Sequence, residues 1–591
     1  MSTSTSTSIN LPTLTRRQSL QLGAATTATG LLAASKLVTP VEAKEVSPPA
    51  TTAFLVSLPV YKAKTPVGWV PGSLSPAPTQ NANWSGGECG RPSHQRASDW
   101  PSQKYYEMRV KEAMHSFHPE LPTQKIWGYD GILPGPTFVE RYGVPITVRI
   151  INELPTNSVG FGSPEISTHL HNLHCGSESD GFTGDYYSAT KHGPTMTGPG
   201  AYKDHHYPNC YAGYDDPKYH ATDGDPREAL GTLWYHDHRI DFTGPNVYRG
   251  LTGFYLLFDD IDSGNERDTN PKALRLPSGV GKYDIPLVFQ DKFFDSSGIV
   301  AFDQFATKGI LGNKFCVNGK VQPKFSVERR KYRFRLLDGG PSRFYEFYLA
   351  SGSGVNQPFD YISNDGNLLP APLRDVKKVH LGVAERADIV IDFSKYPIGT
   401  QLYLVNRLVQ TDGRGPEGPS VNTRGADGLL TTTGTQLLRF DVERDPPTQD
   451  LSQVPAKLRD LPPINLAEVK VSRRWEFDKQ NEVWTVNGKI FDVENPSARP
   501  KRGTAEIWTL KGKGDWSHPV HIHFEEGRIL TRNGKPPAPH EAGRKDVYVL
   551  APGDEVRLFI RFREFTGKYM MHCHNLIHED HAMMIRWDIV E

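Results

Sequence analysis

Short runs of alternating apolar and polar residues recur along the 591-residue chain, for example at residues 137–141, 145–151, 331–337 and 387–393. Successive side chains of a β-strand point to opposite faces, so this alternation is typical of half-buried strands in a β-sandwich. Long helical periodicities are scarce. The pattern therefore predicts an all-β protein built from many short strands.

The composition agrees with strands joined by turns, since the chain has 47 Pro and 54 Gly and 10% of its residues are aromatic. Lys+Arg and Asp+Glu number 67 each. This balance gives no reason to expect nucleic acid or an acidic membrane surface as a partner. No apolar stretch is long enough to cross a bilayer, and we expect no stable membrane anchor.

The length predicts several domains. We place three β-rich domains at residues 44–262, 263–445 and 464–591. A polar, Pro-containing stretch at 446–463 is interpreted as a linker before the last of them.

Residues 1–43 carry the pattern of a twin-arginine signal peptide. Arg16 and Arg17 precede a weakly apolar run at 22–37, and small residues ending at Ala43 offer a cleavage site. We expect export by the twin-arginine route and a periplasmic or secreted protein.

Four histidine motifs suggest a metal site. Residues i and i+2 of a strand share a face, so each His-x-His pair presents two imidazoles side by side. One such pair is usually accidental, but four beside apolar or aromatic strands are not. The motifs are His169-Leu170-His171, His236-Asp237-His238, His518-Pro519-Val520-His521-Ile522-His523 and His572-Cys573-His574.

The last motif indicates copper. Cys573, His578 and Met583 follow a C-x4-H-x4-M spacing, and His518 supplies a second imidazole. Two histidines and a cysteine with a weak axial methionine form the blue-copper electron-transfer site. Cys573 also lies between two histidines that point to the opposite face of a strand. The pattern therefore predicts two metal sites separated by one short stretch of backbone.

In their order and spacing, the four motifs resemble those of the multicopper oxidases, which include laccases and bilirubin oxidases. The stretch from Trp127 to Thr137 also resembles the opening of that family's first domain. The resemblance implies three cupredoxin-like Greek-key domains and four copper ions per chain. It implies His518, Cys573, His578 and Met583 as type 1 ligands; His169 and His521 as type 2 ligands; and His171, His236, His238, His523, His572 and His574 as type 3 ligands.

Within the family, residues 203–209 with 232–238, and Trp516, are similar to bilirubin oxidase; the bacterial spore-coat laccases belong to the same branch. The chain departs from the branch in a longer loop at 210–231. It also has Asn172 where a glycine usually follows the second histidine of the first motif. Neither departure changes a predicted ligand, but both leave the donor preference open.

Reduction of dioxygen consumes protons, so carboxyl groups are expected near the copper cluster. Asp180 and Glu579 match the proton-delivering acids of similar enzymes, although each also fits a surface or turn carboxylate. Glu525 and Glu526 are interpreted as a donor-recognition pair or, equally, as an ordinary solvated pair. Four further histidines are interpreted as residues around the metal sites or on the surface rather than as ligands: His174, His205, His206 and His581.

The sequence leaves the remaining cysteines open, as buried thiols or as up to two disulfides: Cys89, Cys175, Cys210 and Cys316. Two long polar insertions at 185–231 and 408–436 are interpreted as loops bordering an active-site entrance.

These observations predict a copper enzyme that oxidises an organic donor by single electrons near an exposed edge of His518. It would pass the electrons through Cys573 to reduce dioxygen to water. Phenols, aromatic amines and bilirubin-like tetrapyrroles are the expected donors, and we expect a monomer. An oxidase of Cu(I) or Mn(II) is an alternative, disfavoured by only 8 Met without a Met-rich run. A non-catalytic scaffold is a further alternative, disfavoured because no ligand is missing. The physiological donor and the redox potential stay open.

Overall fold

The computed structural model describes residues 47–60, 63–68, 94–157, 160–183 and 196–591. The predicted signal peptide, Cys89 and part of the 185–231 loop lie outside the described residues. No helix in the described ranges is long and apolar enough to span a membrane.

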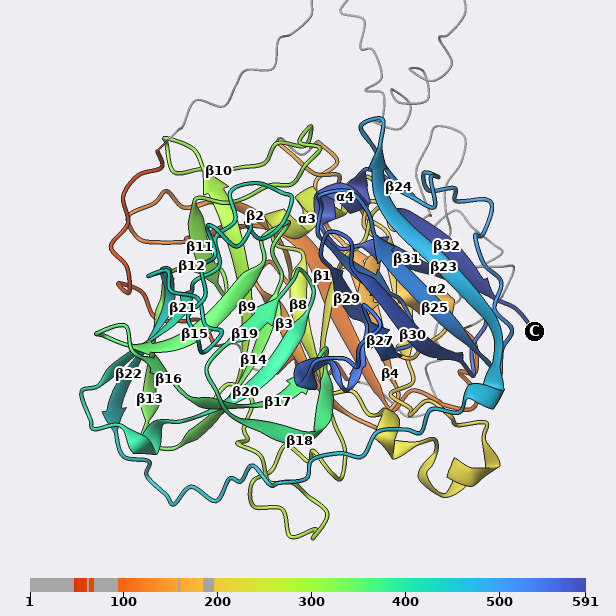
Figure 1. Ribbon diagram of the computed structural model, residues 1–591, viewed down its shortest axis with the longest axis horizontal. Helices are drawn as coiled ribbons and strands as arrows, with labels where there is room; N and C mark the ends of the chain where they lie inside the picture. The colour runs from red at the N-terminus through yellow and green to blue at the C-terminus, as the bar shows by residue number, and fades with distance from the viewer. Residues whose placement is uncertain (1–46, 61–62, 69–93, 158–159, 184–195) are drawn as a thin grey trace, which may run out of the picture. The chain divides into compact units, whose positions relative to one another are not determined.

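The described strands fall into three groups along the chain, each with two sheets (Figure 1). The first group has the sheet orders β2-β1-β4-β6 and β3-β8-β7-β5. Its strands are β1 (Lys104–His115), β2 (Gln124–Tyr129), β3 (Gly135–Arg141), β4 (Ile146–Asn152), β5 (Thr168–His171), β6 (Tyr202–Tyr207), β7 (Thr232–Asp237) and β8 (Thr252–Phe258).

The second group has an eight-stranded and a six-stranded sheet. Its strands are β9 (Asp284–Phe294), β10 (Val300–Ala301), β11 (Lys314–Val317), β12 (Lys320–Val321), β13 (Lys324–Glu328), β14 (Lys331–Asp338), β15 (Tyr345–Ser351), β16 (Asn356–Gln357), β17 (Phe359–Asn364), β18 (Asn367–Val376), β19 (Val379–Leu381), β20 (Arg386–Asp392), β21 (Gln401–Asn406) and β22 (Thr435–Arg444).

The third group has the sheet orders β24-β23-β25-β30-β27-β28 and β29-β26-β31-β32. Its strands are β23 (Val469–Gln480), β24 (Val483–Val486), β25 (Thr504–Gly512), β26 (His518–Ile522), β27 (Gly527–Arg532), β28 (Arg544–Lys545), β29 (Val547–Leu550), β30 (Glu555–Phe562), β31 (Gly567–Cys573) and β32 (Met584–Ile589).

Helices are short in the described part of the chain, and several of them carry or border residues of the predicted sites. The α-helices are α2 (Ser177–Asp180), α3 (Thr243–Arg249) and α4 (Leu576–Asp580). The 3-10 helices are η2 (Pro217–Thr222), η3 (Pro226–Glu228), η4 (Phe393–Lys395), η5 (Leu466–Glu468) and η6 (Pro539–Glu541).

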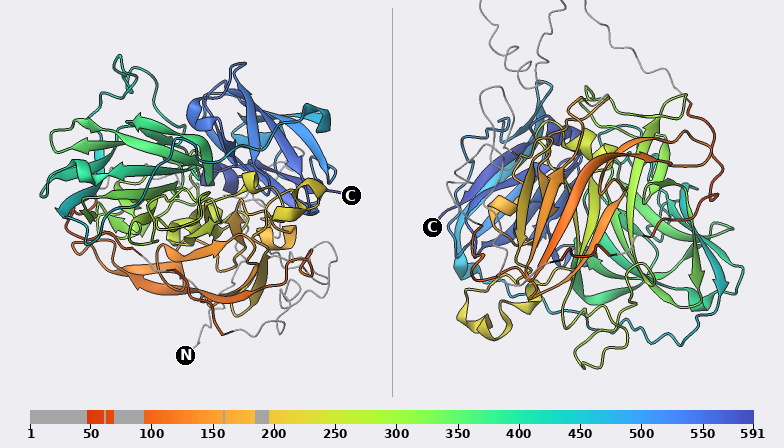
Figure 2. Two further views of the ribbon diagram at one scale, coloured as in Figure 1. Left: turned by 90° about the horizontal axis from the view of Figure 1, so that it is seen from below. Right: turned by 180° about the vertical axis from the view of Figure 1, so that it is seen from behind.

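Each group packs as a sandwich, because one buried cluster draws side chains from both of its sheets. In the first group, Val110 and Val148 of one sheet share a core with Leu170 and Leu233 of the other. A parallel pair also recurs in each group: β1 with β4, β9 with β14, and β23 with β25. The left view of Figure 2 shows the three groups, in orange to yellow, green and blue. The all-β prediction with three cupredoxin-like domains is confirmed, whereas the exact domain bounds stay a prediction.

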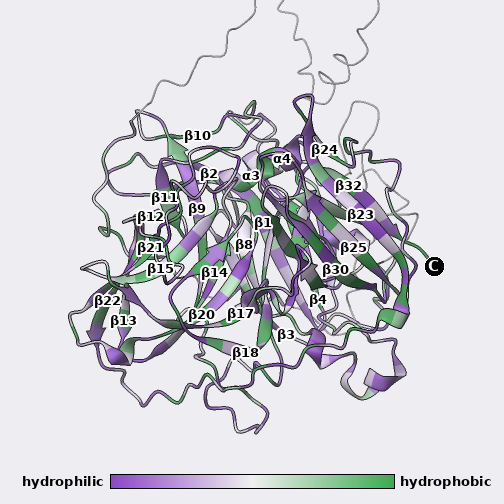
Figure 3. Cartoon of the chain, in the orientation of Figure 1, coloured by the Kyte–Doolittle hydropathy of each residue, from purple (hydrophilic) through white to green (hydrophobic). Residues whose placement is uncertain are grey.

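Alternation produces these sandwiches locally. In β30, Val556, Leu558 and Ile560 are buried, while Glu555 and Arg557 at alternate positions are more exposed. Figure 3 shows the same mixture of hydrophilic and hydrophobic residues along many strands. Strands β5, β7, β26 and β31 differ, since they are buried almost throughout. Both faces of these four strands are therefore covered, and they carry the histidine motifs.

Candidate metal centre

Strands β26 and β31 present residues of two different sites on their two faces. They run antiparallel, with Val520 opposite Cys573 and His521 opposite His572. Val520 and Cys573 belong to the hydrophobic core of the third group. Because side chains alternate along a strand, His521 and His572 point the other way, and their rings lie 5.5 Å apart. Cys573 thus belongs to one site and its two histidine neighbours to the other.

We call the first site the cysteine site, and it consists of His518, Cys573, His578 and Met583. The Cys573 sulfur lies 3.5 Å from Nδ1 of His518 and 3.5 Å from Nδ1 of His578. Helix α4 carries His578, and its first turn is capped by the side chain of Asn575. Met583 is fully buried, and its backbone binds Cys573 and His578 at 3.0 Å each. Two imidazoles and one sulfur therefore converge, with a methionine anchored beside them.

The cysteine site is covered rather than open. The indole of Trp484 stacks on the ring of His578 at 3.7 Å, and Nε2 of His578 lies 3.0 Å from the carbonyl oxygen of Lys308. His518 and His578 are both 0% exposed. The expected exposed edge of His518 is therefore wrong, because Trp484 and a segment of the second group shield this site from solvent.

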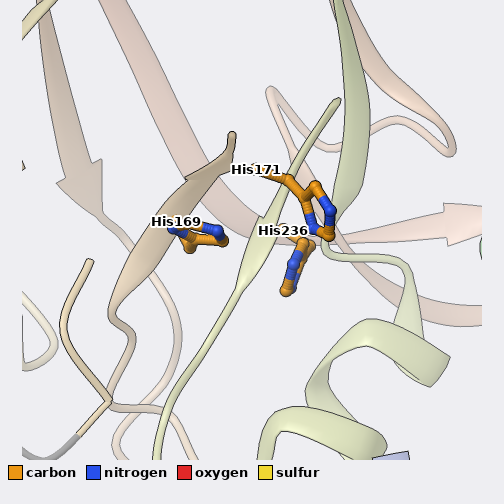
Figure 4. A group of neighbouring side chains, drawn as sticks. All are labelled: His169, His171 and His236. Atoms are coloured by element: carbon orange, nitrogen blue, oxygen red, sulfur yellow. The ribbon is translucent and has the colours of Figure 1, made fainter. Parts of the chain in front are cut away.

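We call the second site the histidine cluster. Imidazoles from β5 and the end of β7 meet those from β26 and β31, so both ends of the described chain contribute. Nε2 of His572 lies 3.1 Å from Nε2 of His238 and 3.2 Å from Nε2 of His523. Figure 4 shows three members gathered together, His169 and His171 from β5 and His236 from β7. The full cluster is His169, His171, His236, His238, His521, His523, His572 and His574, all 0% exposed.

Three buried carboxyl groups each lie between two imidazoles of the cluster. The shortest oxygen-to-nitrogen distances are 2.8 Å for Asp180, 3.0 Å for Glu579 and 2.9 Å for Asp546. Such partners orient metal-binding imidazoles and select their tautomer. Asp180 lies between His169 and His523, Glu579 between His238 and His572, and Asp546 between His171 and His521.

Asp180 and Glu579 thus lie where a proton carrier would be needed. Asp180 ends helix α2, and its Oδ2 accepts a hydrogen bond from Nδ1 of His523. Burial raises the pKa of Asp180 to about 6, although His169 and Lys203 oppose the rise. A carboxyl with this pKa can both hold and release a proton near neutral pH.

Asp546 was not predicted as a site residue, yet its carboxyl contacts both the cluster and the second group of strands. Its carboxylate receives two hydrogen bonds from the guanidinium of Arg386, at 2.7 and 2.5 Å. Both residues are fully buried. Burial raises the pKa of Asp546 to about 7 despite the opposing charge of Arg386. The sequence signal that could have identified Asp546 is a run of three charged residues directly before the apolar strand β29, Arg544-Lys545-Asp546.

The imidazoles have the hydrogen-bond arrangement of metal ligands. Nδ1 of His236 and His521 donate to backbone carbonyl oxygens at 2.8 and 3.0 Å, and Nδ1 of His169 has a similar partner. The Nε2 atoms of these three rings are buried without a hydrogen-bond partner among the described residues. Burial lowers the pKa of His236 to about 3, so its ring stays neutral. Neutral imidazoles and a cysteine sulfur fit copper.

The interpretation of Glu525 and Glu526 as a solvated pair is wrong, because both side chains are buried. Their role in donor recognition stays a prediction. Glu525 pairs with Arg563 at 3.1 Å, and Glu526 pairs with Arg544 at 2.9 Å. The local sequence looked solvent-exposed because the covering arginines come from other strands.

The other four predicted histidines have partners outside the two ligand sets, and the described cysteines other than Cys573 are free thiols. His174 bonds to Glu564, His205 to the carbonyl of Ser179 and His581 to that of Ile577. His206 is buried beside His94. Among the described cysteines, Cys175, Cys210 and Cys316 are buried free thiols, so no disulfide forms between them.

The 408–436 loop borders the cysteine site, as expected. The carbonyl oxygen of Arg414 accepts a hydrogen bond from the backbone of Ser517 at 2.7 Å, directly before His518. The guanidinium of Arg414 lies 5.4 Å from the centre of the Trp516 ring. The described end of the other loop, including Tyr219 and Asp225, instead lines a hollow on another part of the surface.

Comparisons with known proteins agree with this geometry. A family model described as multicopper oxidase matches residues 463–591. Bilirubin oxidase of Albifimbria verrucaria is 35% identical over 489 residues, covering 81% of this chain and 75% of that protein. A laccase of Haloferax volcanii is 31% identical over 520 residues, covering 81% and 80%. The solved structure of McoA multicopper oxidase from Aquifex aeolicus has a TM-score of 0.64 and 25% identity, covering 83% and 97%.

Proposed function

Because the chain belongs to the multicopper oxidase family, whose members are copper oxidoreductases with dioxygen as acceptor, we propose that it couples one-electron oxidation of an organic donor to the four-electron reduction of dioxygen to water. The proposed donors are phenols, aromatic amines or bilirubin-like tetrapyrroles. The relatives named bilirubin oxidase and laccase support this choice.

One observation carries the proposal: the cysteine site and the histidine cluster share the three consecutive residues His572, Cys573 and His574. An isolated cysteine site would make only an electron carrier. Here the Cys573 sulfur meets His518 and His578 on one face of β31, while its neighbours enter the cluster on the other. Backbone and one side chain therefore separate the two sites.

We propose that the predicted ligand set holds one type 1, one type 2 and two type 3 copper ions. Bound copper would supply reversible one-electron redox chemistry and a place for dioxygen. The rings of His238, His523 and His572 converge on one position, and those of His169 and His521 lie 5.7 Å apart. His171, His236 and His574 form a third group, with ring centres 5.3–5.9 Å apart.

The protein residues around these positions orient rings and hold protons. Asp180 and Glu579 are the proposed proton carriers for the cluster, because each carboxyl contacts two of its imidazoles. Trp484 and the backbone at Lys308 keep bulk water from His578. The donor would therefore give its electrons across this thin cover rather than to an exposed ring.

The test combines copper quantification with the visible spectrum of the purified protein. About four coppers per chain and a strong blue absorbance are expected for a cysteine-ligated site beside a three-copper cluster. A protein with fewer than about two coppers and no blue band would contradict the proposal.

We also propose that the protein is exported by the twin-arginine route and acts as a monomer. The paired arginines and cleavage pattern of residues 1–43 support export. A single chain supplies every residue of both sites, so no second copy is needed to complete them.

A further inference from the structure

A surface hollow of about 560 Å³ is bordered by residues of the first and third strand groups. None of the predicted copper ligands lines it. Its lining includes Glu228, Arg563 and Glu564. The side chains of Glu228 and Glu564 are only 4% and 2% exposed, so the hollow ends on buried charge.

Two arginines connect this hollow to residues deeper in the protein. Arg563 pairs with Glu228 at 3.0 Å and with Glu525 at 3.1 Å. Arg544 pairs with Glu228 at 2.9 Å and with Glu526 at 2.9 Å. Two guanidinium groups thus pair with three carboxyl groups, so the negative partners outnumber the positive ones by one. In a buried environment, a carboxyl without a counter-charge of its own tends to keep its proton.

A small void lies behind Glu228. Its volume is about 10 Å³, which is room for roughly one water molecule. Three of its lining residues carry a buried polar atom without a hydrogen-bond partner among the described residues. These atoms are Oδ1 of Asn172, Nδ1 of His174 and Nε of Arg544. The void therefore offers the two to four polar partners that a buried water needs.

The inner wall of the void adjoins the histidine cluster. Asn172, the residue that replaces the family's usual glycine, directly follows His171 and donates a hydrogen bond from Nδ2 to Oε1 of Glu526 at 2.7 Å. Asn367 donates to the same oxygen at 2.5 Å. Asp546 lies close enough to Glu526 to raise its pKa, and contacts His171 itself. Glu526 is thus fixed between the void and the cluster.

We propose that the hollow, Glu228, the void and Glu526 form a proton-entry route to the histidine cluster, separate from Asp180 and Glu579. In each passage, Glu526 accepts a proton from a water in the void, which regains one from solvent in the hollow, and then gives its proton to a water on the cluster side that delivers it to the oxygen being reduced. Only O–H bonds form and break, and the carboxyl returns to its starting state. Reduction of one dioxygen to two waters consumes four protons, and this inference rests on that proposed function.

The charges around Glu526 agree with such a role. Burial, together with the charge of Asp546, raises the pKa of Glu526 to about 8, although Arg544, Asn367 and Arg386 oppose the rise. A carboxyl in this range exchanges its proton near neutral pH. The groups facing it are Arg544 of β28, Asp546, Asn172, Asn367 of β18 and Arg386 of β20.

The test uses the full chain with Glu526→Gln, which keeps the side-chain length but cannot carry a proton. We expect unchanged copper content and blue absorbance, and a rate of dioxygen consumption about tenfold lower at neutral pH with an altered solvent deuterium isotope effect. In the copper-free protein, infrared difference spectra over a pH titration should lose one buried carboxyl signal. This second measurement does not depend on oxidase activity.

Two further variants make the result decisive. Glu541→Gln is the matched control, because Glu541 is a buried carboxyl paired with Arg532 outside the route; it should leave the rate unchanged. Ala212→Val adds two methyl groups beside the void and removes no charge. It should slow dioxygen consumption as Glu526→Gln does, and it covers the case in which Glu526→Gln does not fold.

Some outcomes would overturn the route. One is a Glu526→Gln protein with lower copper content and an unchanged pH profile, which would show that Glu526 only balances the copper charge. Another is normal dioxygen consumption in both Glu526→Gln and Ala212→Val. If instead the unmodified protein binds copper but reduces no dioxygen, the proposed function fails, while the infrared titration still reports on Glu526.

Discussion

The cysteine site and the histidine cluster lie on opposite faces of the same two strands, yet their surroundings differ. His578 contacts an indole and a backbone carbonyl, from Trp484 and Lys308. The cluster instead has carboxyl groups between its imidazoles, such as Asp180 and Asp546. A site that exchanges only electrons needs a rigid, apolar cover. A site that reduces dioxygen also needs groups that hold protons and balance charge.

The two sites also differ in how they are assembled. His518, Cys573, His578 and Met583 all come from the third group of strands, whereas the cluster joins both ends of the described chain. Buried ion pairs hold that junction together, and Arg544 with Glu228 is one of them. Arg386 with Asp546 joins the third group to the second. Changes at the cysteine site should therefore act on electron transfer, and changes around the cluster on assembly and proton supply.

The largest effect is expected from Cys573→Ser. A hydroxyl is a poor substitute for the thiolate of a blue-copper site, so the blue absorbance and the oxidation of phenolic dyes should both be lost. The cluster residues are unchanged, and copper quantification should show loss of about one ion. Oxidation of the dye at the normal rate would mean that electrons bypass Cys573.

Asp546→Asn should act on the cluster and spare the cysteine site. It removes the nearer of the two buried carboxylates beside the guanidinium of Arg386, the other being Asp365 at 3.9 Å. Breaking a buried ion pair typically costs about 3–5 kcal/mol. We expect a lower urea midpoint and fewer bound coppers, with the blue band retained. Asp588→Asn is the control, because Asp588 pairs with Arg586 near the surface, where such a pair contributes about 0–1 kcal/mol. Equal effects of the two variants would contradict a special role for Asp546.

Glu564 extends the charged surroundings toward the surface hollow. Burial alone would raise its pKa, but the hydrogen bond from His174 and the charge of Arg563 lower it from 4.5 to about 2. A carboxyl with a depressed folded-state pKa stabilises the fold above its unfolded pKa, and this contribution is lost as pH falls from 4.5 toward 2.

Glu564→Gln should therefore lower the free energy of unfolding by up to about 3 kcal/mol at pH 7, and by much less at about pH 3. Urea titrations of the copper-free protein at both pH values measure this difference. The exposed Glu482→Gln should show a much weaker dependence, because the carboxylate that pairs with Lys479 there lies in solvent. A penalty for Glu564→Gln that is the same at both pH values would exclude the ionic explanation.

The smallest effect is expected from Trp484→Phe. The change removes the hydrogen bond from the indole to the carbonyl oxygen of Thr307 and part of the stacking on His578, at a cost of about 1 kcal/mol. Copper content should stay the same while the rate of donor oxidation changes, as steady-state kinetics would show. Trp475→Phe, in the same core but away from His578, should leave that rate unaltered.

Much of this comparison could be predicted from the sequence, because it depends on local geometry. The i, i+2 spacing of His572 and His574 places them on one face of a strand and Cys573 on the other, whatever the rest of the chain does. The alternating pattern of strands such as β30 likewise predicts a sandwich.

What could not be predicted depends on residues far apart along the chain. His518 was expected to be exposed, but Trp484 and the backbone at Lys308 cover the site only after the second and third groups pack together. Glu526 looked solvated because its partner Arg544 follows many residues later. Asp546 carries no motif of its own, and its importance comes from Arg386, in another strand group.

The central claim is that the two sites work as one enzyme, and the ratio of electrons to dioxygen tests it most directly. Donor oxidation and oxygen consumption are measured together on the copper-loaded protein, with an assay for hydrogen peroxide. We expect four one-electron donors to be oxidised per dioxygen, with no peroxide released. Two donors per dioxygen with peroxide released would show that the cysteine site does not deliver electrons to a working cluster.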